Sequence, residues 1–145
     1  MKRLKDIITW RLSLIEAALF LSFARFVVVF LPFKVWTALF NDIVEETDVG
    51  TLPQGDDYIA LRKPRRLAGA VSRVAPLLPF QAVCLPQAMA LYWMMRWRGY
   101  HGMKISYGTR ISSQQEFQAH AWLTLDDTVL IGWHDGTFSP IASLR

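Results

Sequence analysis

The stretch from Val83 to Arg96 constrains this chain more than any other, because it joins the only cysteine to a strongly helical run. Prolines interrupt the preceding segment, and Pro86 suits a first helical turn, where a missing backbone N–H costs nothing. We therefore predict a helix that has Cys84 at or just before its N-cap and runs to about Arg98. Gly99 then marks its end.

Cys84 at this position has two interpretations. The free N–H groups and the positive dipole end of a helix favour the thiolate, which would make Cys84 a nucleophile. Alternatively, Cys84 is a buried cysteine that behaves as a small apolar side chain.

His120 favours the first interpretation. It lies in segment 116–125, which alternates like a half-buried strand. A cysteine on a helix and a histidine on a sheet are what a Cys–His hydrolase needs. The alternative for His120 is a structural role in the core. Taken as a pair, however, Cys84 and His120 favour a catalytic role.

Composition limits the class of protein. The chain has 145 residues, enough for one domain with a sizeable core, and 52% of them are hydrophobic. Its net charge of +4 indicates a basic surface somewhere, but we expect no nucleic-acid partner. A single cysteine excludes an internal disulfide and fits a reducing compartment, so we expect a cytoplasmic protein.

The N-terminal part raises the question of a membrane segment. Residues 12–31 have about the length of a transmembrane helix. However, Glu16 and Arg25 lie inside this run, and each charge near a bilayer centre costs roughly 2.5–3.5 kcal/mol. We therefore predict two helices packed on the domain, the first ended by Pro32 and the second at 33–43, with membrane-surface association as an alternative.

The next two segments are strongly charged. Residues 42–57 hold half of the twelve acidic residues and predict a solvated loop. A third helix, from about Asp57 to Val74 with Pro64 near a break, carries several basic residues beside an apolar stripe. Its charged face is either solvated or a docking surface for an acidic partner or peptide.

Three segments after the cysteine helix predict an antiparallel meander. They are 103–108, 116–125 and 128–132, the last two joined by a tight turn at Asp126-Asp127. Pro140 argues against a further central strand. The predicted fold class is thus α+β, with N-terminal helices and a nucleophile helix packed on a small antiparallel β-meander. We expect a single domain, 1–145, with a helical part at 1–76 and the catalytic helix plus meander at 77–145.

Asp135 is the candidate third member of the site, because a base histidine is usually oriented by an acid or amide. A two-residue turn at Asp126-Asp127 would pair His120 with Trp133, so a side chain at 132–135 could approach the imidazole. Asp135 is the only acid in that segment. Its alternative role is that of a turn residue.

The remaining chemistry follows from the residue types. The helix N-terminal amides near Cys84 and Leu85 are natural oxyanion donors, and Gln81 is a side-chain candidate, as is Gln87. No metal or other cofactor is required. A zinc site of Cys84, His120 and His134 lacks a close-spaced ligand pair and ranks below the thiol mechanism.

The sequence resembles the lasso-peptide leader peptidases, which are transglutaminase-like cysteine proteases of ribosomal peptide maturation. The most specific similarity combines the helix start Cys84–Leu91 with Ala119–Leu123. Weaker similarity covers nearly the whole chain, at Glu16-Ala17, Leu31–Phe33, Arg98–Tyr100, Val129–Gly132 and Phe138–Ile141.

The resemblance implies a transglutaminase- or papain-like core with a Cys84-His120-Asp135 triad that cleaves the leader from a precursor peptide. A separate ATP-dependent cyclase would then close the macrolactam. The family's acid commonly falls where this chain has Gly132 and Trp133, so Asp135 is displaced. We expect a stand-alone protease that needs a separate leader-binding protein.

Two other function classes stay open at this point. One is a transglutaminase-like acyl transferase or deamidase that uses the same residues on a glutamine side chain. The other is a non-catalytic, membrane-associated interaction domain in which Cys84 is inert.

Overall fold

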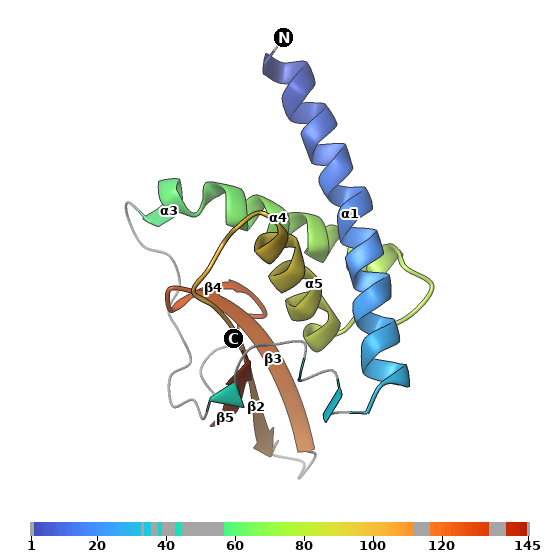
Figure 1. The fold of residues 1–145 in the computed structure, drawn as a ribbon, viewed down its shortest axis with the longest axis vertical. Coiled ribbons are helices and arrows are strands. Elements are labelled where there is room, and N and C mark those ends of the chain that lie inside the picture. Colours follow the sequence, from blue (N-terminus) through green and yellow to red (C-terminus); the bar gives the residue numbers. More distant parts are fainter. Residues whose placement is uncertain are drawn as a thin grey trace.

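Helix α5 (Cys84–Trp97) is the centre of the fold, and both helices and a sheet pack against it (Figure 1). The computed structural model describes residues 2–32, 34–35, 38, 43–44, 57–111, 117–133 and 139–144. α5 is apolar around its whole circumference, a pattern typical of a helix that is buried on all sides. Its fully buried side chains include Met89, Leu91, Met94 and Met95.

The helices before α5 follow the prediction, with one division. α1 (Lys2–Phe30) ends just before Pro32, as expected. The predicted third helix is split into α3 (Asp57–Ala60) and α4 (Arg62–Val74), and the 3₁₀ turn η1 (Ala75–Leu77) follows. The amphipathic character of α4 is confirmed, because its apolar stripe is buried at Leu67, Ala70, Val71 and Val74.

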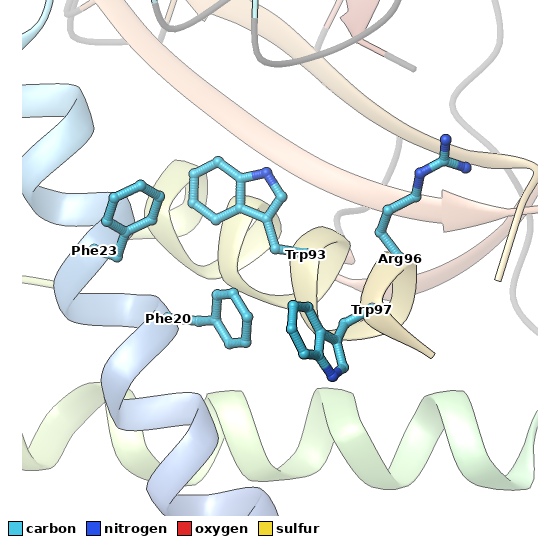
Figure 2. A pocket seen from close by; sticks show the side chains of 5 residues that line it. All are labelled: Phe20, Phe23, Trp93, Arg96 and Trp97. Carbon is cyan, nitrogen blue, oxygen red and sulfur yellow. The ribbon is translucent and has the colours of Figure 1, made fainter. Parts of the chain in front are cut away.

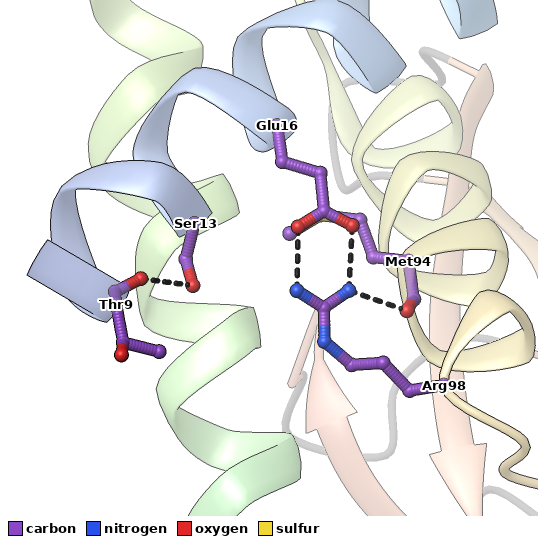
Figure 3. Close-up of polar contacts among 5 residues, drawn as sticks. All are labelled: Thr9, Ser13, Glu16, Met94 and Arg98. Atoms are coloured by element: carbon purple, nitrogen blue, oxygen red, sulfur yellow. Dashed lines mark hydrogen bonds and ion pairs between the residues drawn. The ribbon is translucent and has the colours of Figure 1, made fainter.

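A two-pronged ion pair ties α1 to the end of α5 (Figure 3). The guanidinium of Arg98 donates to both carboxylate oxygens of Glu16, and each distance is 2.5 Å. Arg98 also donates to the carbonyl oxygen of Met94, at 2.9 Å. Glu16, a charge inside an apolar run, therefore fixes the position of α1 on the nucleophile helix.

The sheet contains the predicted meander and two further strands. β2 (Met103–Ile111), β3 (Phe117–Leu125) and β4 (Thr128–Ile131) pair antiparallel in sequence order. β5 (Ser139–Leu144) returns to the other side of β2, and β1 (Ile43–Val44) pairs with β5, which gives the order β1-β5-β2-β3-β4. The predicted α+β class is confirmed, with a larger sheet than the sequence indicated.

Pro140 was expected to argue against a further central strand, but it lies in β5, which stands between β1 and β2 in the sheet. Pro140 lies in β5 opposite Gly108, at an irregularity in the β2–β5 register. Within the described residues, β1 pairs with β5 only at Ser143 and Leu144, and Pro140 lies beyond that short ladder. A proline is tolerated at such an irregularity, where its missing N–H breaks no ladder.

The β3–β4 hairpin turns as predicted but then changes register. Asp126 and Asp127 both have positive φ, 47° and 65°, which is the conformation of a two-residue hairpin turn. Thr124 pairs with Val129, but Leu123 pairs with Ile131, so a bulge inserts one extra residue in β4. The expected pairing of His120 with Trp133 assumed an unshifted register, which this bulge interrupts between Thr124 and Leu123.

Two smaller predictions also differ from the structure. A second helix was predicted at 33–43, but Ile43 belongs to β1. Residues 34–35 are helical, and most of the remaining segment lies outside the described residues. β3 does not alternate as a half-buried strand, because all residues from Ala121 to Leu125 are buried. β3 is an inner strand between β2 and β4, and α5 packs against it.

Candidate active site

Cys84 is the first residue of α5, where the chain changes from an extended to a helical conformation. Val83 has an extended backbone, with φ −73° and ψ −172°, and its carbonyl oxygen accepts the first helical hydrogen bond from the N–H of Gln87, at 3.2 Å. Pro86 lies buried in this first turn, where it removes no hydrogen bond. The helix start was predicted to within one residue, because Val83 and not Cys84 is the N-cap.

Cys84 and His120 meet between α5 and β3. Burial by itself raises the pKa of the Cys84 thiol, but other groups outweigh burial and hold this pKa below its ordinary value. They are the hydrogen bond with the His120 ring, the backbone N–H of Ala121, the charge of His120 and the backbone N–H of Leu85. The half-buried thiol thus has the electropositive surroundings of a reactive cysteine.

The other side of the imidazole is held by the backbone. His120 Nε2 lies 2.9 Å from the carbonyl oxygen of Gly132. A carbonyl oxygen can only accept, so Nε2 must carry a hydrogen. Nδ1 is then the ring nitrogen that can take up or return the proton of Cys84.

Gly132 has a conformation that another residue would not adopt easily. Its φ is +79°, and a Cβ at this position would lie 2.5 Å from the carbonyl oxygen of Ala121 and 2.9 Å from the Cα of Trp122. Both are backbone atoms, which cannot move aside as a flexible side chain would. The glycine lets the chain after β4 approach β3 closely enough to present its carbonyl to His120.

Trp122 explains part of the Ala-His-Ala-Trp motif. His120 and Trp122 are two residues apart on β3 and therefore point to the same side of the sheet. Their rings are nearly parallel, with centroids 6.3 Å apart and an interplanar angle of 23°. Trp122 is fully buried, so it forms a fixed wall beside the imidazole.

Comparison with protein families decides the affiliation of this chain. A family described as the transglutaminase-like superfamily matches residues 27–143, from the end of α1 to the last strand. The chain belongs to the transglutaminase-like superfamily. Members of this superfamily are usually cysteine proteases or transferases. Neither the curated proteins nor the solved structures gave a match.

Two groups in this transglutaminase-like site were missed by the sequence reasoning. They are the backbone N–H of Ala121, which contacts the Cys84 sulfur, and the carbonyl of Gly132. Backbone groups leave little trace in a sequence. The one available signal was a glycine directly after the third strand, where the resemblance led us to look for an acid.

The predicted oxyanion donors have different positions. The N–H of Leu85 lies beside the Cys84 sulfur, as a helix N-terminus requires. Gln81 is exposed on the loop that approaches α5. The amide of Gln87 donates to the carbonyl oxygen of Ala82, at 2.6 Å, and so holds this loop against the helix. Gln87 therefore has a structural partner, whereas Gln81 stays a candidate.

A cavity of about 680 Å³ opens beside the start of α5. Its walls are the prolines and apolar side chains of 75–76 and 78–83, together with Gln87. Since Val83 directly precedes Cys84 in the chain, this cavity lies next to the residue that carries the thiol.

Asp135 and His134 lie outside the described residues. The role of Asp135 as third member therefore stays a prediction. Among the residues that the structure describes, no three His, Cys, Asp or Glu side chains are grouped so as to hold a metal ion. The zinc alternative depends on His134 and stays untested.

Proposed function

We propose that this protein is a cysteine peptidase that removes the leader from a ribosomally made lasso precursor peptide. The observation that carries the proposal is the contact between the Cys84 thiol and the His120 imidazole at the start of α5. Superfamily membership supports the class of chemistry. The lasso substrate rests on the sequence resemblance at Cys84–Leu91 and Ala119–Leu123.

The reaction begins with the thiolate. Cys84 attacks the scissile carbonyl, and His120, which holds the thiol proton, delivers it to the departing amine. Water then hydrolyses the thioester with His120 as the base. Because Gly132 fixes the ring through Nε2, Nδ1 performs both proton transfers without a rotation of the imidazole.

The negative charge that develops on the substrate oxygen needs donors. The backbone N–H groups at the start of α5, including that of Leu85, are free of helical acceptors and point in the direction of the helix dipole. Gln81 is the side-chain candidate for a further donor. Such pre-oriented groups stabilise the tetrahedral intermediate because they need not reorganise during the reaction.

Asp135 has a secondary part in this proposal. It follows Gly132 by three residues, so its charge would stabilise the imidazolium that forms when His120 holds the proton. The orientation of the ring is already provided by the carbonyl of Gly132. In this proposal Asp135 stabilises the positive charge of the imidazolium, and the carbonyl of Gly132 orients the ring.

The proposed partners are the precursor peptide, a separate leader-binding protein and an ATP-dependent lasso cyclase, all in the cytoplasm. The basic face of α4 supports contact with an acidic partner or peptide, because Arg62, Lys63, Arg66 and Arg73 are exposed there. Charge of this kind steers association more than it sets affinity.

The deciding experiment follows a precursor peptide with its leader by mass spectrometry, in the presence of the leader-binding protein. We expect two fragments from a single cleavage, and none with Cys84→Ala. An intact precursor at enzyme levels that label fully with a thiol probe would overturn the peptidase assignment.

A second candidate, an acyl transferase or deamidase, is favoured by the superfamily alone. Every amide substrate passes through the same thioester at Cys84. Adding a primary amine to a glutamine-containing peptide separates the two functions. Amine incorporation or glutamine deamidation without backbone cleavage would favour this second candidate.

A further inference from the structure

Helix α1 has two apolar stripes on opposite faces. One stripe is buried against the domain and includes Ala17, Leu21, Ala24 and Val27, each at most 1% exposed. The other follows the same three- and four-residue spacing, and its members are between 49% and 69% exposed. This outer stripe consists of Leu4, Ile8, Leu12, Ile15, Leu19, Phe23, Phe26 and Phe30.

The outer stripe is unusually long for a surface in contact with water. α1 has 29 residues, which gives about 43 Å of helix at 1.5 Å per residue. It is the one helix in the described part of the chain that is long and apolar enough to cross a membrane. A helix that is apolar on all sides is normally covered on all sides. The domain covers only the inner stripe.

The charges of α1 indicate what covers the outer stripe. The helix contains five basic and two acidic residues, and Glu16 is neutralised by Arg98. Lys5 and Arg11 are exposed and adjoin Ile8, three residues away on the helix surface, and Arg25 adjoins Val29. Long basic side chains at the margin of an apolar face reach anionic headgroups while their stems stay in the apolar layer.

An aromatic notch extends the stripe towards the end of α5 (Figure 2). It has a volume of about 430 Å³ and is lined by Phe20 and Phe23 of α1 and by Trp93, Arg96 and Trp97 of α5. Trp97 is 84% exposed, and Figure 2 shows its ring on the side of α5 that faces Phe20, whereas the Arg96 side chain points away. Tryptophan next to an apolar face is typical of the headgroup level of a bilayer.

The inner contacts exclude one orientation. If α1 crossed a bilayer, its inner stripe would leave the domain and the Glu16–Arg98 pair would break (Figure 3). A helix that lies in the plane of the surface keeps both. The domain then packs on the face of α1 that points away from the bilayer, which in an ordinary interfacial helix is a polar face in contact with water.

We propose that α1 lies in the surface of an anionic lipid bilayer through its outer stripe, with the aromatic notch at headgroup level. A second copy of the chain packed in parallel fits this face less well, because it would place the basic margins of the two copies together. The inference does not depend on the proposed peptidase activity.

The test is flotation of the full chain with vesicles of phosphatidylcholine, alone or mixed equally with phosphatidylglycerol. We expect binding to the mixed vesicles, weaker binding to phosphatidylcholine alone, and partial release by salt. A matched pair of double variants identifies the face. Leu12→Gln with Leu19→Gln is expected to weaken binding about tenfold or more. Ile59→Gln with Leu77→Gln, at sites that are both 80% exposed elsewhere, is expected to leave it unchanged.

Each other outcome overturns the proposal. If the chain does not bind the mixed vesicles, or if both double variants lose binding equally, the outer stripe does not bind a lipid surface. A dimer in light scattering that Leu12→Gln with Leu19→Gln dissociates would assign the face to a second copy. Resistance of the bound chain to extraction by alkaline carbonate would show that α1 spans the bilayer instead of lying in its surface.

Discussion

His120 Nε2 lies 2.9 Å from the carbonyl oxygen of Gly132, one residue after β4 ends. This contact assigns the hydrogen of the neutral imidazole to Nε2 and leaves Nδ1 for the thiol. The histidine of the site is therefore oriented by the backbone, and the following predictions depend on this arrangement.

Substitution of either the nucleophile or the base is expected to abolish turnover to a similar extent. Cys84→Ala and His120→Ala should each lower turnover by roughly 10⁴-fold or more, because residues that act as one unit lose nearly everything singly. Peptide cleavage by mass spectrometry measures the loss, and circular dichroism checks that the helices are retained. Substantial cleavage by the Cys84→Ala variant would disprove the nucleophile assignment.

The ionisation of Cys84 is expected to occur at lower pH in the folded than in the unfolded chain. Burial raises the pKa of this thiol. The contacts with His120, Ala121 and Leu85 lower it by more than burial raises it, so the net shift of the pKa is downward. The alkylation rate against pH measures this pKa, and the single cysteine makes the label specific. His120→Ala should move the midpoint up. Coincident midpoints for folded and unfolded chains would contradict the site.

Gly132→Ala is expected to inactivate the protein beyond its effect on stability. Gly99 is the matched control, since its φ is +80° but a Cβ there would meet nothing within 4 Å. Both variants should lose about 1–2 kcal/mol of folding stability for a left-handed alanine, and Gly132→Ala should lose more because its Cβ would also clash with backbone atoms of β3. Only Gly132→Ala should also lower turnover, because a Cβ would displace the carbonyl from His120. Equal turnover in the two folded variants would show that the carbonyl does not position the ring.

Asp135→Asn is expected to lower turnover by about tenfold, far less than the roughly 10⁴-fold that follows when an acid alone sets the tautomer. The reason is that Gly132 already orients the imidazole. Asp127→Asn is the control; it weakens the 2.8 Å ion pair with Lys104 at the far end of the hairpin and should leave turnover unchanged. A loss as large as that of His120→Ala would make Asp135 the main orienting group.

The chain alone is expected to be a slow peptidase on its precursor. Remote binding energy normally positions a scissile bond, and a partner that holds the leader would raise the local substrate concentration to roughly millimolar. Cleavage rates with and without the leader-binding protein, at enzyme levels below the precursor, measure the effect. Equal rates would show that the chain recognises its leader unaided.

The elements that the sequence predicts well are those with a strong local signal. Pro86 and Cys84 mark the start of α5, and the Asp126-Asp127 turn with apolar runs on both sides marks the hairpin. Superfamily membership was also contained in the cysteine and histidine motifs. These features depend on residues close together in the chain.

The features that were missed depend on pairing between distant residues. β5 returns to β2 in spite of Pro140, because the proline lies at an irregularity in the register, where a missing N–H is tolerated. The extra residue in β4 shifts the register after Thr124, and no residue in 128–131 signals it. The register assumed for position 133 took no account of this shift, and the acceptor for His120 was sought among carboxylates because main-chain carbonyls leave no mark in a sequence.

The carbonyl of Gly132 has a consequence for how such a site is studied. Substitutions that only remove side-chain atoms leave main-chain acceptors in place, so variants of Cys84, His120 and Asp135 would not report the carbonyl group that also takes part. The contribution of that group can be read only from changes in the polypeptide path itself, at Gly132 or in the bulge that precedes it.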